Sequence, residues 1–106
     1  MSDWVNVVAT KDIIENKPYS IEIDGAQIIV FKLKNEFYAI ENICTHDGGE
    51  LLGGCINENE IICPRHGARF SIKTGDALSA PAYEPIAIFP IRIENNMLQV
   101  RDDRFD

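Results

Sequence analysis

The amino-acid sequence predicts an all-β domain of short antiparallel strands, arranged as a small sandwich or open barrel. Polar and apolar residues alternate with a period of two over much of the chain, as they do in half-buried strands. No segment keeps a helical period of 3.6 residues over three turns. A length of 106 residues suits one domain with a modest core, so we expect residues 1–106 to form a single domain.

The strands are expected mainly outside the middle of the chain, where six segments are rich in alternating or β-branched apolar residues. They are, in chain order, Val5–Val8, Tyr19–Ile23, Ala26–Leu33, Phe37–Ile40, Ile86–Glu94 and Met97–Arg101. Asp24-Gly25 is suited to a type I′ turn, and Asn95-Asn96 to a turn with positive φ. A turn at Asn35-Glu36 is expected before Phe37, and Thr10 is expected to cap a single helical turn through Ile13 and Ile14.

The stretch from about residue 43 to residue 85 has a different composition. It holds six of the seven glycines and three of the five prolines, and its apolar runs are very short. Two or three very short strands are expected there, such as Glu60–Cys63 and Ala68–Ile72. We therefore predict a loop-rich subdomain over about 43–85, inserted in the β base, and loops of this kind often carry functional groups.

Two short motifs in this stretch contain both histidines and two of the three cysteines. Cys44-Thr45-His46 and Cys63-Pro64-Arg65-His66 are separated by sixteen residues. Two thiolates and two imidazoles form a ligand set that suits an iron–sulfur cluster or zinc. Structural zinc sites usually pair like ligands, as Cys-x₂₋₄-Cys and His-x₃₋₅-His, so the Cys-x-His order is a poor match to zinc.

These motifs resemble those of Rieske-type [2Fe–2S] proteins, and the whole chain resembles the soluble ferredoxin components of multicomponent ring-hydroxylating dioxygenases. The resemblance covers residues 44–49 and 63–70, the segment 75–78 and the proline loop around Pro81. It implies one Rieske [2Fe–2S] cluster, with Cys44 and Cys63 on one iron and His46 and His66 on the other. It also implies that the 43–85 subdomain binds this cluster and that seven further residues lie around it: Asp47, Gly48, Gly49, Arg65, Gly67, Ala68 and Pro81.

The function that the resemblance implies is one-electron transfer from a flavin-dependent NAD(P)H reductase to a terminal oxygenase. The chain itself is expected to be a monomeric carrier and no enzyme, because no histidines remain for a mononuclear iron site. Two alternatives stay open at this point. One is a small subunit of a nitrite reductase or another redox complex, and the other is a zinc-stabilised binding module.

The charge and the cysteine content narrow the expected partners and compartment. A net charge of −7 argues against nucleic acid and anionic membranes, and it fits a partner with a basic patch. Met1–Trp4 has no signal-peptide character, and the longest apolar run, Ile28–Phe31, is far too short to span a membrane. We therefore expect a cytoplasmic protein, in which Cys55 is a buried or half-buried free thiol.

The resemblance also predicts where the reduction potential lies. High-potential Rieske proteins of respiratory chains carry a disulfide between the two loops, at positions that match Gly49 and Arg65 here. They also carry two hydroxyl donors toward sulfur, at positions that match Ala68 and Phe70. Because donors toward sulfur stabilise the added electron, we expect a potential near the low end of about −150 to +300 mV.

Overall fold

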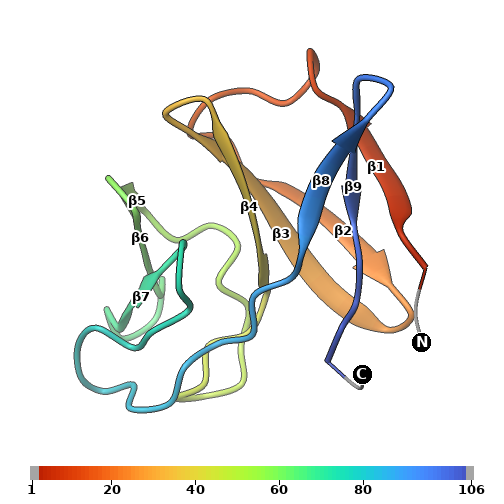
Figure 1. Ribbon diagram of the computed structural model, residues 1–106. Helices are drawn as coiled ribbons and strands as arrows, with labels where there is room; N and C mark the ends of the chain where they lie inside the picture. Colours follow the sequence, from red (N-terminus) through yellow and green to blue (C-terminus); the bar gives the residue numbers. More distant parts are fainter. Residues whose placement is uncertain (1–2, 105–106) are drawn as a thin grey trace.

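The computed structural model describes residues 3–104, so residues 1, 2, 105 and 106 of the predicted domain lie outside the described residues. Within residues 3–104 the chain forms nine strands and no helix (Figure 1). The strands are β1 (Val5–Ala9), β2 (Tyr19–Ile23), β3 (Ala26–Leu33), β4 (Glu36–Glu41), β5 (Ile56–Asn57), β6 (Glu60–Ile62), β7 (Arg69–Ser71), β8 (Ile91–Glu94) and β9 (Met97–Val100). The predicted all-β class of short antiparallel strands is confirmed.

Three antiparallel sheets of three strands each make up the fold, in the orders β1-β9-β8, β2-β3-β4 and β5-β6-β7. Figure 1 shows the small β5-β6-β7 sheet beside the two larger ones, and it lies within the 43–85 stretch. No helix long and apolar enough to cross a membrane occurs among residues 3–104.

Strand β3 is central to the packing because both of its faces are buried. Its successive side chains point to opposite faces, as in any strand. Ile28 and Val30 pack in one core with side chains of β1 and β9. Ile29, Phe31 and Leu33 pack in a second core with side chains of β6 and β7. The β base and the loop-rich subdomain are thus joined through one strand.

Four hairpin turns among residues 3–104 use residues with positive φ, at Asp24-Gly25, Lys34-Asn35, Glu58 and Asn95-Asn96. Of the three that the sequence predicts, two are placed correctly. Asp24 and Gly25 have φ of 49° and 84°, as a type I′ turn requires. The turn predicted at Asn35-Glu36 is one residue too late, because Lys34 and Asn35 have positive φ and Glu36 already pairs with Leu33. The carboxylate of Glu15 accepts hydrogen bonds from the backbone N–H groups of both turn residues.

Two further predictions about local structure are wrong. Residues 10–12 form a turn and residues 10–14 contain no helix, since the Thr10 hydroxyl donates to the carbonyl oxygen of Asn96 at 3.2 Å instead of capping its own segment. The strand predicted from Ile86 begins only at Ile91. Pro90 stands immediately before it, and a proline has no N–H to donate to a strand ladder.

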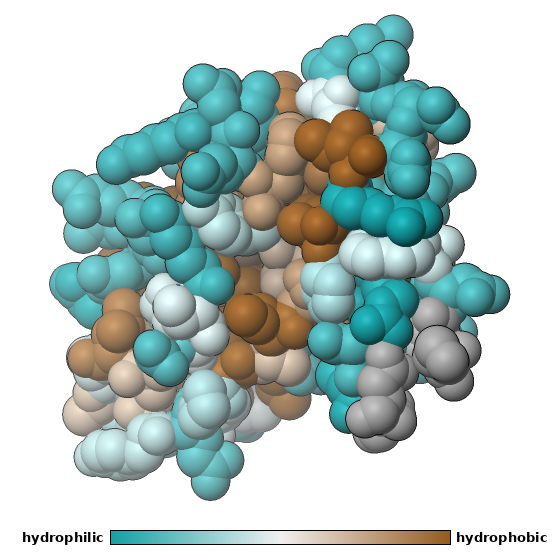
Figure 2. Space-filling model, viewed as in Figure 1, coloured by the Kyte–Doolittle hydropathy of each residue, from teal (hydrophilic) through white to brown (hydrophobic). Residues whose placement is uncertain are grey.

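One face of the molecule carries an apolar strip. Figure 2 shows hydrophobic side chains along the middle of the face on which β8 lies in front, with hydrophilic side chains to both sides. Ile93 in β8 and Ile88 just before it are 52% and 44% exposed. Single exposed apolar residues are common on soluble domains, and these two lie outside both Cys/His motifs.

Candidate metal centre

Two loops with the same backbone hydrogen bonding carry the Cys/His motifs. In each loop the cysteine N–H donates to the carbonyl five residues later, and the cysteine carbonyl accepts from the glycine N–H four residues later. The four donor–acceptor distances are 2.7 Å for Cys44 N to Gly49 O, 2.7 Å for Gly48 N to Cys44 O, 2.7 Å for Cys63 N to Ala68 O, and 3.1 Å for Gly67 N to Cys63 O. Gly48 and Gly67 have φ of 76° and 77°, a backbone conformation that favours glycine at both positions.

The two loops bury their cysteines and expose their histidines. Cys44 and Cys63 are 0% and 2% exposed and belong to the core that also contains Phe70. The rings of His46 and His66 are exposed and perpendicular, with centroids 5.1 Å apart. Potential ligand atoms form two groups, and within each group all atoms lie within 4.8 Å of one another. One group is Cys44, Asp47 and Cys63, and the other is His46, Asp47 and His66. The structure therefore brings the four predicted ligands together in one site.

Burial and ion pairing set the charges at this site. Burial raises the pKa of the Cys44 thiol, and the neighbouring Cys63 raises it further. A metal cation bound at this site would make the thiolate favourable. The Arg65 guanidinium holds the pKa of the Asp47 carboxyl well below its usual range, and Asp47 in turn raises the pKa of Arg65.

The donor set fits a cluster that has one sulfur-ligated and one nitrogen-ligated iron. Two adjacent sulfurs face the core, and two adjacent imidazoles face solvent, on loops of matching geometry. None of the three cysteines, all of which lie in the described part of the chain, forms a disulfide, so both motif thiols are available as ligands.

The residues predicted around the cluster occupy distinct places. Arg65 reaches across to Asp47 in the first loop, at 2.5 Å from Nε to Oδ2. Ala68 is buried, and neither it nor the buried Phe70 has a hydroxyl to donate. Pro81 is half-buried in a loop whose next residue, Ala82, packs in the same core as Cys44.

Two residues that the sequence reasoning missed support the first loop. The Thr45 hydroxyl donates to the carbonyl oxygen of Glu84 at 2.6 Å and so joins this loop to the proline loop. The buried Asn42 accepts hydrogen bonds through Oδ1 from the N–H groups of Leu51 and Leu52, at 2.8 and 2.9 Å. The sequence offers one signal for this role, which is an asparagine two residues before the first cysteine motif. That signal does not identify its partners, because they lie nine and ten residues further along the chain.

Cys55 is a free thiol as predicted, but the prediction that it is buried or half-buried is wrong, because the structure exposes this residue. Ile56, the first residue of β5, packs against the core. Since neighbouring side chains in an extended segment point in opposite directions, Cys55 is turned toward solvent.

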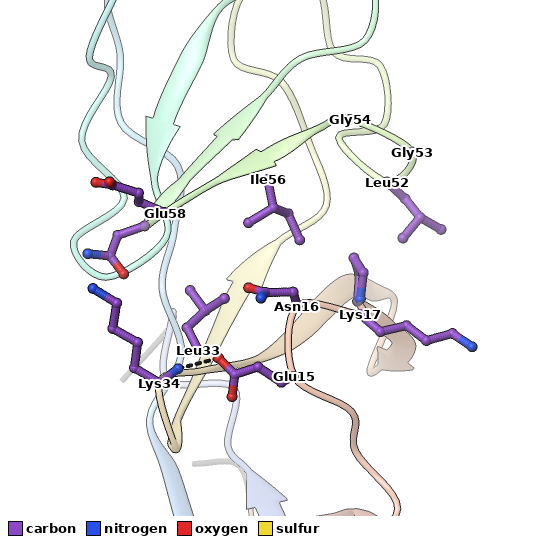
Figure 3. A pocket seen from close by; sticks show the side chains of 12 residues that line it. Glu15, Asn16, Lys17, Leu33, Lys34, Leu52, Gly53, Gly54, Ile56 and Glu58 are labelled. Atoms are coloured by element: carbon purple, nitrogen blue, oxygen red, sulfur yellow. Dashed lines mark hydrogen bonds between the residues drawn. The ribbon is translucent and has the colours of Figure 1, made fainter.

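A cleft of about 700 Å³ lies elsewhere, between the β base and β5 (Figure 3). Leu33 and Ile56 line it together with Glu15, Lys34 and Glu58, whose side chains are exposed. Its lining includes neither of the Cys/His loops, so it is separate from the candidate metal centre.

Comparison with known proteins places the fold and site in one family. Residues 3–90 match the Rieske [2Fe-2S] domain family, and the chain belongs to this family. It carries a [2Fe–2S] cluster of the Rieske type, and its role is electron transport rather than catalysis.

Individual relatives show which kind of Rieske protein the chain is similar to. The chain is 36% identical over 92 residues to the ferredoxin component of the naphthalene 1,2-dioxygenase system of Pseudomonas putida, covering 87% of this chain and 88% of the relative. Its fold matches the ferredoxin of carbazole 1,9a-dioxygenase from Nocardioides aromaticivorans IC177 with a TM-score of 0.87, 26% identity, and coverage of 92% and 95% of the two chains. It also matches a chain in a complex of reduced oxygenase and oxidized ferredoxin in carbazole 1,9a-dioxygenase, with a TM-score of 0.87, 29% identity and 92% coverage of both chains. The chain is thus similar to ferredoxins of dioxygenase systems over nearly its full length.

Proposed function

We propose that Cys44 and Cys63 hold one iron of the cluster and that His46 and His66 hold the other. The observation that carries this assignment is the division of the site into two buried sulfurs and two exposed imidazoles. The equivalent backbone of the two loops supports it, since each loop then supplies one sulfur and one nitrogen. The bound cluster supplies reversible uptake of a single electron.

The exposed histidines mark the edge at which redox partners approach. The His66 side chain is 57% exposed, whereas both cysteines are covered by the core. We propose that the protein is a monomeric cytoplasmic carrier between a flavin-containing NAD(P)H reductase and a terminal oxygenase. The oxygenase complex of the carbazole system, which contains a ferredoxin, supports the choice of an oxygenase as electron acceptor.

Absorption and EPR spectra of the purified protein, before and after dithionite, test this function. We expect a red-brown protein whose reduced form gives the low average g value of a histidine-ligated cluster. The variants His46→Cys and His66→Cys should each lose that signature, because nitrogen ligation is replaced by sulfur. Potentiometric titration should give a value below zero, in the lower part of the range of about −150 to +300 mV.

Other outcomes would favour the alternatives. A colourless protein with stoichiometric zinc would support the zinc-stabilised module and contradict the carrier. Co-purification with a large redox enzyme, and no reduction by a separate reductase, would support an obligate subunit such as that of a nitrite reductase. A monomer that a ferredoxin reductase reduces at the expense of NADH or NADPH would support the free carrier.

A further inference from the structure

The two cluster loops share a backbone but differ in the position of the histidine. Counted from the cysteine, the histidine is the second residue in the first loop and the third in the second loop. Each loop therefore has one of these two positions left for another side chain. Asp47 takes it in the first loop, and Arg65 takes it in the second.

Asp47 and Arg65 form a two-point ion pair across the gap between the loops. Arg65 Nε lies 2.5 Å from Asp47 Oδ2, and Arg65 Nη2 lies 3.0 Å from Asp47 Oδ1. The Arg65 Nη1 group also donates to the carbonyl oxygen of Glu50 at 2.8 Å. Asp47 Oδ1 in turn accepts from the N–H of Gly49 at 2.9 Å, so the carboxylate is oriented by its own loop.

Gly49 allows this arrangement because the arginine side chain occupies the space next to it. A Cβ atom at position 49 would lie 2.5 Å from Arg65 Cζ, closer than nonbonded carbon atoms approach. Arg65 thus contacts the first loop at three residues, Asp47, Gly49 and Glu50. These residues lie where the chain leaves the loop and returns to the core at Leu51.

We propose that the Asp47–Arg65 ion pair is a clamp that holds the two cluster loops together and slows loss of the cluster. The hydrogen bonds of each loop close that loop on itself, whereas this pair joins one loop to the other. Charged, two-point hydrogen bonds are stronger and more directional than neutral ones. The proposal rests on the ligand assignment proposed above, because a clamp matters to the cluster only if both loops hold it.

The charges of the pair should also affect the reduction potential of the cluster, which a contact without charge would not do. Its two charges are opposite, so the intact ion pair carries no net charge. Removing the arginine alone leaves a negative charge beside the site, which disfavours the added electron and lowers the potential. Removing the aspartate alone leaves a positive charge and raises the potential, while removing both leaves the potential close to that of the wild type.

The test is a double-mutant cycle on the holoprotein with Asp47→Asn, Arg65→Gln and the double variant. The rate of cluster loss is followed as the decay of visible absorbance in the presence of an iron chelator. Each single variant should lose the cluster about threefold to tenfold faster, a modest effect because both side chains are partly exposed. The double variant should be no faster than Arg65→Gln, and the two single variants should shift the potential in opposite directions.

Two further variants keep the result interpretable. Gly49→Ala retains both charges but displaces the arginine side chain, so it should also speed cluster loss. Glu60→Gln breaks the Arg69–Glu60 pair, a neighbouring ion pair between β6 and β7 that does not join the two loops, and it should leave the rate unchanged.

Wild-type rates of cluster loss in Arg65→Gln and Gly49→Ala would overturn the clamp, as would additive effects of the two single substitutions. A wrong ligand assignment would give a different result from a wrong clamp. In that case the His46→Cys and His66→Cys variants would keep the EPR signal of the wild-type protein.

Discussion

Asn42 illustrates how much of the site depends on one uncharged side chain. It is 6% exposed, and its backbone N–H donates to Gln27 O. Its side-chain oxygen accepts from the N–H groups of Leu51 and Leu52, and its side-chain nitrogen donates to Glu50. A buried polar group is favourable only when it is hydrogen-bonded. Asn42 therefore positions the chain as it leaves the first cluster loop and enters the core at Leu51.

We predict that Asn42→Ala lowers the free energy of unfolding by about 1–3 kcal/mol, because it leaves the Leu51 and Leu52 N–H groups without an acceptor. Urea denaturation measures this loss. Asn57→Ala, at an exposed asparagine in β5, is the matched control and should cost much less. Equal losses in the two variants would show that the buried hydrogen bonds of Asn42 are not important for stability.

Asp102, near the other end of the chain, is a buried carboxylate that forms an ion pair with Arg104. Its side chain is 4% exposed and accepts from Arg104 Nε at 2.9 Å and from Nη2 at 2.9 Å. Arg104 also contacts Glu41 at the end of β4, at 3.2 Å. These hydrogen bonds from Arg104 lower the pKa of Asp102.

A carboxyl whose pKa is lower in the folded state stabilises the fold above its ordinary pKa of about 3.9 and loses that contribution as the pH falls through the folded value. We therefore predict that Asp102→Asn reduces the dependence of stability on pH below about pH 4. Denaturation curves collected from pH 6 downward measure the slope, with Asp3→Asn at an exposed position as control. An unchanged acid slope in Asp102→Asn would contradict this role.

At the scale of single elements, β3 connects the β base to the cluster loops. Ile28 and Ile29 are adjacent, of the same type and both 0% exposed, yet they belong to different cores. Ile29 shares its core with Cys44 and Cys63, whereas Ile28 packs with the side chains of β1 and β9. The strand thus allows the two cores to be perturbed separately.

We predict that Ile28→Ala and Ile29→Ala each destabilise the fold by about 2–5 kcal/mol, as buried large-to-small substitutions do. Only Ile29→Ala should also speed cluster loss under native conditions, because its cavity opens in the core that contains Cys44 and Cys63. Urea denaturation and the chelator assay measure the two effects. Faster cluster loss in both variants, to the same extent, would show that the two cores do not act independently.

The whole molecule combines an acidic surface with one exposed redox edge. The net charge is −7, and the two histidines reach solvent while Cys44 and Cys63 do not. Long-range attraction between an acidic carrier and a basic partner speeds their encounter, and salt screens it.

We predict that the rate of electron transfer with a physiological reductase or oxygenase falls as ionic strength rises from about 0.01 to 0.5 M, where the Debye length shortens from about 30 Å to a few ångströms. Stopped-flow reduction at several salt concentrations measures this dependence. A rate that stays constant or rises with salt would contradict recognition by a basic patch.

Much of the β base could be predicted because its signals are local. The alternation in Tyr19–Ile23 and Ala26–Leu33 gives both strands their observed bounds, and Asp24-Gly25 forms the expected turn. Two of the predictions that failed, at Thr10 and Cys55, depended on contacts with distant segments. Thr10 bonds to Asn96 in the last hairpin, and the packing of Ile56 on the core turns Cys55 outward.

The sequence by itself determined the Cys/His donor set and its spacing, because these are residue type and order, and its resemblance to Rieske proteins predicted the class of cluster. It also determined that the cluster loops lie on a β scaffold, since the period of the apolar residues is local information. Only the tertiary structure decided that the sulfurs are buried and the imidazoles exposed, that Arg65 bridges to Asp47, and that Asn42 holds the first loop. These features depend on which loops meet in space, and residues eighteen positions apart, such as Asp47 and Arg65, are brought together by the packing of both loops on one core.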